Sequence, residues 1–148
     1  MKFGISTFVT DDTIDTVTLA QAIEERDFDA LAIAEHTHIP ASRESAYPLG
    51  GELPAIYYRT LDPFVTLAAA AAVTSRIQLV TGIALLIQRD PIIAAKEAAS
   101  IDLISHGRFV FASAPGGIWR SYAITAPTRD ARRAAGRADR SDQGALDH

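Results

Sequence analysis

A short polar segment, Glu35-His36-Thr37-His38, directly follows an almost continuous apolar run. An imidazole at the end of a buried strand can donate or accept a proton near neutral pH, because its pKa is normally about 6.5. The Glu35 carboxylate can bind a ligand, or it can serve as a hydrogen-bonded link between a strand and a helix. The segment is therefore the first candidate site, in which His36 is either a catalytic residue or a hydrogen-bonded structural histidine.

The spacing of His36 and His38 also fits a metal site, since side chains two residues apart in an extended chain point to the same side. A metal-dependent hydrolase is thus an alternative function. The other histidines give it little support, because His106 stands beside Gly107 at a predicted helix end and His148 is the final residue. No later carboxylate cluster completes a coordination shell, and metal analysis of the purified protein distinguishes this alternative.

Further candidate site residues lie at the ends of other predicted strands or inside them. They are Ser6 and Thr7 in the first strand and Thr81, Gly82 and Ile83 in the third. Glycine inside a strand often marks a bulge or a close approach of another group, so Gly82 lies either against a ligand or at a plain bend. Residues 37–62 form a predicted long loop. Three arginines could bind a ligand or form ion pairs that stabilise the fold: Arg43, Arg59 and Arg89. Three tyrosines could line a ligand pocket or pack the long loop: Tyr47, Tyr57 and Tyr58.

Strands and helices alternate along the first 111 residues. Asp15 is a predicted helix N-cap, and Asp62-Pro63 and Asp90-Pro91 each place a capping acid before a proline at the first helical position. The predicted strands cover residues 2–9, 28–34, 77–87 and 108–111, with Gly107 at the C′ position of the last helix. The apolar run within 28–34 predicts a strand covered on both faces. The alternation predicts an α/β fold, either a doubly wound sheet or a (β/α)8 barrel.

Composition limits the classes of partner. The chain has 148 residues, is 48% hydrophobic and carries a net charge of −4, so it has no basic field for nucleic acid or an anionic membrane. Cysteine is absent, and the first residues contain no long apolar run, so we expect neither disulfides nor a secretion signal. The longest apolar stretch, Leu67 to Val73, is too short to span a bilayer. These features predict a cytoplasmic protein that binds neither nucleic acid nor a membrane.

Several short motifs occur in an order and spacing that resemble the luciferase-like monooxygenase superfamily, most closely its coenzyme F420-dependent oxidoreductases. The motifs are Phe3-Gly4-Ile5-Ser6, Ala34 to Pro40, Tyr58 to Pro63, Val80-Thr81-Gly82-Ile83, Arg89-Asp90-Pro91 with Lys96-Glu97, and Gly107-Arg108-Phe109. The resemblance extends from Lys2 to Phe111, which corresponds to about three and a half of the eight strand-helix units of a barrel.

The resemblance implies the N-terminal portion of a TIM-type (β/α)8 barrel. It implies that coenzyme F420, or in some relatives FMN, binds at the C-terminal ends of the strands and exchanges hydride with a small organic substrate. It places His36 there as a catalytic and cofactor-binding residue. The other cofactor-binding residues it implies are Ser6, Glu35, Thr81, Gly82 and Ile83. Relatives also carry a cis peptide bond close to Gly82.

After Phe111 the sequence departs from the family pattern. If one guanine is deleted from codons for the family's Gly-Val-Gly-Ala-Gly-Trp-Asn, the shifted frame spells Ala112 to Gly117. Six of the fourteen basic residues, all arginine, follow Trp119. We therefore expect a partial barrel over residues 1–111 and an out-of-frame, largely irregular tail over 112–148. A natural polar tail is the alternative, and sequencing the coding DNA from Phe111 to Arg133 distinguishes the two.

A barrel that stops at its fourth strand has functional consequences. The first and fourth strands each lack a partner, so their exposed edges could support self-association into a homo-oligomer. The remaining strands would also supply much of a cofactor site. The sequence therefore leaves two interpretations open: a truncated F420- or flavin-dependent oxidoreductase, and an inactive fragment that binds F420 weakly or not at all.

Overall fold

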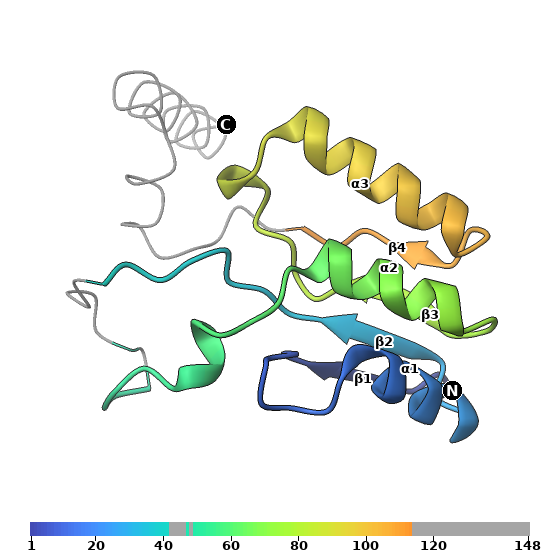
Figure 1. Cartoon of the computed structure of the whole chain (residues 1–148), viewed down its shortest axis with the longest axis horizontal. Helices are drawn as coiled ribbons and strands as arrows, with labels where there is room; N and C mark the ends of the chain where they lie inside the picture. Colours follow the sequence, from blue (N-terminus) through green and yellow to red (C-terminus); the bar gives the residue numbers. More distant parts are fainter. Residues whose placement is uncertain (42–46, 48, 114–148) are drawn as a thin grey trace, which may run out of the picture.

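The computed structural model describes residues 1–41, 47 and 49–113. The elements are β1 (Gly4–Thr7), α1 (Thr16–Glu25), β2 (Ala30–Ile33), η1 (Ala55–Tyr57), α2 (Pro63–Val73), β3 (Gln78–Thr81), η2 (Leu86–Gln88), α3 (Pro91–Ile104) and β4 (Phe109–Val110). The four strands are parallel and adjacent in chain order, and successive helices lie side by side (Figure 1). The predicted α/β alternation is confirmed. Most of the predicted tail, residues 114–148, and Arg43 lie outside the described residues.

One face of the sheet is buried beneath the helices. Strand register places Ile5, Leu31, Leu79 and Phe109 in one row across the four strands. Leu31 and Leu79 are fully buried, and they join a core that contains apolar residues of all three long helices. The helical members include Ala20 and Ile23 of α1, Phe64, Leu67, Ala70 and Ala71 of α2, and Ile101 of α3.

The opposite face of the sheet carries small side chains. Ser6, Ala32 and Val80 share a row, in which Ser6 is exposed while Ala32 and Val80 are half-buried. The expectation that residues 28–34 form a strand covered on both faces is therefore wrong for the described part of the chain. In a closed barrel the strands across the interior cover this face, and none of the elements described here does so.

The predicted helix starts are confirmed. Asp15, Asp62 and Asp90 are the N-caps of α1, α2 and α3. Asp15 accepts a hydrogen bond from one backbone N–H group of the first turn, and Asp62 and Asp90 each accept from two. The predicted end of α3 is displaced by one residue. His106, with φ of 55°, occupies the left-handed C′ position, and the Gly107 N–H donates to the Asp102 carbonyl at 2.9 Å.

The third strand is shorter than expected. The prediction extended it to residue 87, but β3 ends at Thr81, and the chain then turns into η2, where the Gln88 N–H donates to the Leu85 carbonyl at 2.9 Å. The prediction is wrong here because β-branched and apolar residues, which are typical of strands, continue beyond Thr81 although the chain turns there.

A carboxylate of α1 fixes the turn between α2 and β3. Glu24 accepts hydrogen bonds from the backbone N–H groups of Ser75, Arg76 and Ile77 at 2.6 to 3.1 Å. Partial burial would raise the pKa of Glu24, but these hydrogen bonds outweigh that effect, so its pKa is lowered. Glu24 therefore stabilises the fold in its ionised form.

We expect Glu24→Ala to lower the free energy of unfolding by about 1 kcal/mol at pH 7, because three N–H groups lose a partly exposed charged acceptor. The wild-type advantage is complete above the unfolded-state pKa of about 4.3 and disappears as the pH falls through the lower folded-state pKa. Urea unfolding at pH 7 and pH 3 measures this dependence. Glu25→Ala is the control, because Glu25 is exposed on the same helix, and an equal loss in both variants would contradict the assignment.

Candidate functional site

The side chain of His36 lies among aromatic rings at the C-terminal ends of β1 and β2. Its ring is stacked near Phe8 with 6.2 Å between centroids, and it meets Tyr57 of η1 edge-on at 5.2 Å. The Tyr47 and Tyr57 hydroxyls are 3.3 Å apart. The structure thus joins the segments that follow the first two strands, together with two of the tyrosines from the predicted loop.

The backbone of His36 is held by Thr60. The Thr60 hydroxyl donates to the His36 carbonyl at 3.1 Å, and the His36 N–H points back to Thr60 Oγ1 at 3.5 Å. Burial lowers the pKa of the His36 imidazole, and the neighbouring Glu35 carboxylate opposes this only in part. The ring is therefore mostly neutral at pH 7, with one nitrogen able to donate and the other able to accept.

Glu35 is the centre of a buried ion-pair network. Its side chain is only 1% exposed, and its Oε2 lies 2.5 Å from Arg89 Nη2. Its Oε1 accepts the Leu85 N–H at 2.7 Å, while Arg89 also contacts Asp62 Oδ2 at 2.6 Å. Both carboxylate oxygens are thus bound by the protein, which favours the strand-to-helix link among the roles expected for Glu35. Arg89 is likewise ion-paired.

Arg89 is stabilised in its charged form. Burial by itself would lower its pKa, but the hydrogen bonds to Glu35 and Asp62 outweigh burial, so the pKa is raised. The guanidinium also lies over the Phe64 ring, 4.7 Å from the centroid, and Glu97 Oε2 is 3.7 Å from its Nη1. A single cation therefore faces three carboxylates.

The third-strand candidates differ in their surroundings. Thr81 is fully buried, and its hydroxyl donates to the Ala112 carbonyl at 2.7 Å and accepts the Ala112 N–H at 2.8 Å. The peptide bond between Gly82 and Ile83 is cis, as the resemblance implied. A Cβ on Gly82 would lie 3.2 Å from Ala32 Cβ, so the close approach is to the neighbouring strand. Ile83 is 46% exposed.

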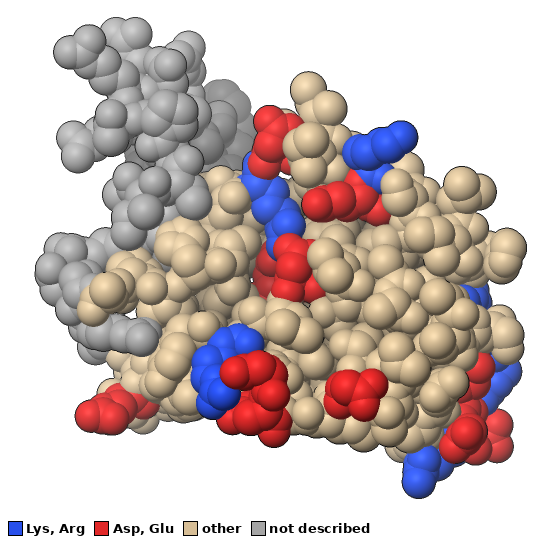
Figure 2. Space-filling view, viewed as in Figure 1, with Lys and Arg blue, Asp and Glu red and all other residues tan. Residues whose placement is uncertain are grey.

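The remaining candidates are exposed or half-buried. Ser6 is exposed at the end of β1, and the Thr7 hydroxyl donates to the Phe8 carbonyl at 3.0 Å. Arg59 forms ion pairs with Asp11 and Asp12, each at 2.7 Å. On the face shown in Figure 2, basic and acidic side chains lie beside one another in small groups.

The metal alternative gains no support from the described part of the chain. Across residues 1–41, 47 and 49–113, no group of three or more His, Cys, Asp or Glu could hold a metal ion. His36 packs against aromatic rings, whereas His38 Nδ1 lies 3.1 Å from Thr37 Oγ1.

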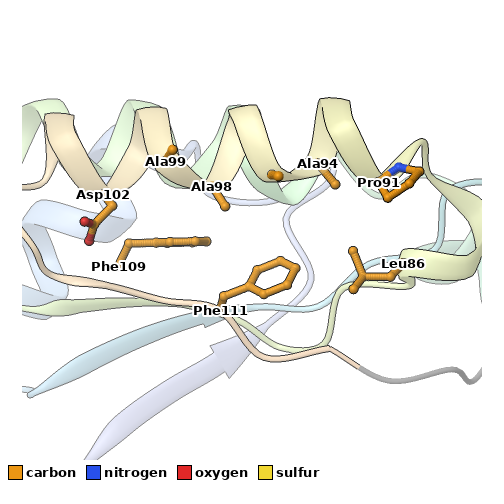
Figure 3. A pocket seen from close by; sticks show the side chains of 9 residues that line it. Leu86, Pro91, Ala94, Ala98, Ala99, Asp102, Phe109 and Phe111 are labelled. Carbon is orange, nitrogen blue, oxygen red and sulfur yellow. The ribbon is translucent and has the colours of Figure 1, made fainter.

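An apolar groove of about 500 Å³ lies between α3 and the end of β4 (Figure 3). It is lined by Leu86, Pro91, Ala94, Ala95, Ala98, Ala99, Asp102, Phe109 and Phe111, and by none of the predicted site residues. In a complete barrel this is the position where the next helix packs. No helix of the described residues is long and apolar enough to cross a membrane.

Residues 1–137 match the family model for luciferase-like monooxygenases. The chain belongs to the luciferase-like monooxygenase family. The match continues beyond residue 111, where the predicted partial barrel ends, and the boundary at that residue stays a prediction.

Similarity to individual proteins covers only part of their length. The uncharacterized protein Rv0953c of Mycobacterium tuberculosis (strain ATCC 25618 / H37Rv) is 46% identical over 111 residues, which are 73% of this chain and 39% of the relative. The monooxygenase RslO1 from Streptomyces bottropensis is 27% identical with a TM-score of 0.67, over 90% of this chain and 39% of that one. This chain thus spans 39% of the length of each.

Two more distant structures show the same fold. The coenzyme F420-dependent tetrahydromethanopterin reductase from Methanopyrus kandleri is 24% identical with a TM-score of 0.59, covering 83% of this chain and 29% of that chain. The oxygenating constituent of 3,6-diketocamphane monooxygenase from Pseudomonas putida, in complex with FMN, is 17% identical with a TM-score of 0.65, covering 90% of this chain and 35% of that chain. The predicted fold, the N-terminal part of a TIM-type barrel, is confirmed.

Proposed function

We propose that this luciferase-like chain carries the N-terminal part of an oxidoreductase site, in which hydride passes between F420 or FMN and a small organic substrate. The position of His36 carries the proposal: a half-buried, mostly neutral imidazole at the C-terminal ends of β1 and β2, the end at which barrel enzymes perform their chemistry. Relatives of this fold include a protein described as F420-dependent and one in complex with FMN, so both cofactors are candidates.

The residues present fit a planar, hydrogen-bonding ring. His36 offers one donor and one acceptor, Ser6 offers an exposed hydroxyl, and Ile83 offers an exposed apolar surface. A bound F420 or FMN would supply the hydride-transferring ring. The side chains of Glu35 and Thr81 are bonded to other protein groups, and Gly82 packs closely on the neighbouring strand. These three residues therefore fix the surrounding backbone and do not contact the ring.

We expect F420 and FMN to shift the imidazole signals of His36 in spectra of the full chain labelled with ¹⁵N-histidine. His106 is the internal control in the same spectra, because it is exposed at the end of α3. His36→Ala should weaken binding while the fold is retained. Unchanged His36 signals at saturating concentrations of both cofactors would refute the proposal.

The second candidate is a chain without catalytic activity. Four strands form the sheet of the described residues, so groups that other barrel strands would bring to a cofactor are missing from this part. We expect dissociation constants on the order of 1 mM for F420 and FMN, equivalent to about −4 kcal/mol. Titration of cofactor fluorescence measures this, and tight binding with hydride transfer would exclude an inactive chain. Self-association through the strand edges and a cytoplasmic location remain predictions.

A further inference from the structure

We infer that Glu35 and Arg89 are positioning residues, which hold His36 at its place in the site by joining the segment after β2 to the segment after β3. This inference rests on the proposed function of His36. In this role neither residue contacts the cofactor or the substrate, because both Glu35 oxygens are bound by protein groups.

The two sequence neighbours of His36 both bind residues 85–89. On one side, Glu35 accepts the Leu85 N–H at 2.7 Å and pairs with Arg89 at 2.5 Å. On the other side, the Thr37 hydroxyl donates to the Gln88 side-chain oxygen. The segment that carries His36 is therefore fixed on both sides to η2 and the two residues that flank it.

A third segment completes the arrangement. Arg89 reaches Asp62, the N-cap of α2, at 2.6 Å, and Thr60 holds the His36 backbone. One guanidinium and a small set of hydrogen bonds thus form a junction between three segments, residues 35–37, 60–62 and 85–89. The His36 ring projects from this junction onto Phe8 and Tyr57.

The energetics fit a positioning role better than a stabilising one. Burying an ion pair carries a large desolvation penalty, and apolar residues of similar volume are often as stable in its place. What an ion pair provides is a defined geometry, since the planar guanidinium has fixed donor directions. The Glu35–Arg89 pair, whose side chains are 1% and 13% exposed, can therefore orient the His36 segment without dominating the stability of the fold.

The charges near His36 make the role measurable without any ligand. Glu35 is the charged group on its own segment, Tyr57 is the titratable group packed on the ring, and Arg89, Asp62 and Glu97 lie behind Glu35. The attraction of Glu35 raises the pKa of His36 and burial lowers it. Loss of the carboxylate and loosening of the segment therefore move this pKa in opposite directions.

The test is an NMR titration of the histidine rings in the full chain, without cofactor. We expect Glu35→Gln to lower the pKa of His36 further and Arg89→Met to raise it, because the latter leaves Glu35 unpaired. Should either single variant fail to fold, the apolar double variant Glu35→Met/Arg89→Met keeps the volume. In it we expect the His36 signals to broaden and the cofactor-induced shift to weaken several-fold, while circular dichroism stays unchanged.

Arg59→Met is the matched control, since Arg59 forms two exposed ion pairs nearby and takes no part in the junction. It should leave the His36 signals as in the wild type. A folded double variant with wild-type His36 signals and a wild-type cofactor response would overturn the inference. Failure of the proposed function is distinct, because it appears as a wild-type His36 that does not respond to F420 or FMN.

Discussion

Arg108→Met should lower the free energy of unfolding by about 3 kcal/mol, because one guanidinium holds the carbonyl ends of two helices. Its Nη2 donates to the carbonyls of Ala71 and Thr74 at 3.2 and 2.8 Å, and its Nη1 donates to the Ile77 carbonyl at 2.9 Å. Its Nε donates to the Ser105 carbonyl at 2.8 Å. The cation also lies at the negative ends of α2 and α3, where the helix dipoles favour it.

Urea unfolding followed by circular dichroism measures the effect of Arg108→Met. Arg108→Lys should give an intermediate loss, since an ammonium keeps the charge but cannot donate in several fixed directions. Arg26→Met is the control, because Arg26 is exposed and its side chain donates to the Ala22 carbonyl at the end of α1. If Arg108→Met and Arg26→Met lower the free energy of unfolding by equally small amounts, the Arg108 guanidinium does not hold the helix ends.

The helix starts could be predicted from the sequence because their causes are local. Asp62-Pro63 and Asp90-Pro91 contain both the capping acceptor and the residue whose missing N–H needs no partner. The end of β3 could not be predicted in this way. Its last residue, Thr81, is held by the backbone of Ala112, 31 residues further along the chain. Nothing in the local pattern marks that contact.

The candidate site was predictable in its position but not in its bonding. His36 follows a buried strand, and parallel strands bring such residues to one edge of the sheet. The network around Glu35 depends on Arg89, which is 54 residues away, and on Asp62, which the sequence identified only as a helix cap. Phe8 and Thr60 also contact His36 and were missed as site residues. Phe8 was missed because the predicted first strand, residues 2–9, included it, whereas β1 ends at Thr7.

The two faces of the sheet could not be distinguished from the sequence alone. Residues 28–34 form an apolar run, which fits a strand buried on both faces, as in a closed barrel. In the described residues only the helix-facing side of β2 is fully buried, because the cover of the other side in a barrel comes from strands across the interior. Stability of this part of the chain should therefore depend on one packed face.

Leu79→Ala tests that conclusion, and it should lower the free energy of unfolding by about 3–4 kcal/mol. Leu79 is fully buried in β3 between the sheet and the helices, so truncation leaves a cavity in the core. Val80 is the next residue of the same strand, and its half-buried side chain faces the opposite side. Val80→Ala should lower the free energy of unfolding by less than about 1 kcal/mol. Urea unfolding at several protein concentrations compares the two variants, and a large, concentration-dependent loss in Val80→Ala would instead indicate that a second copy of the chain covers the open face.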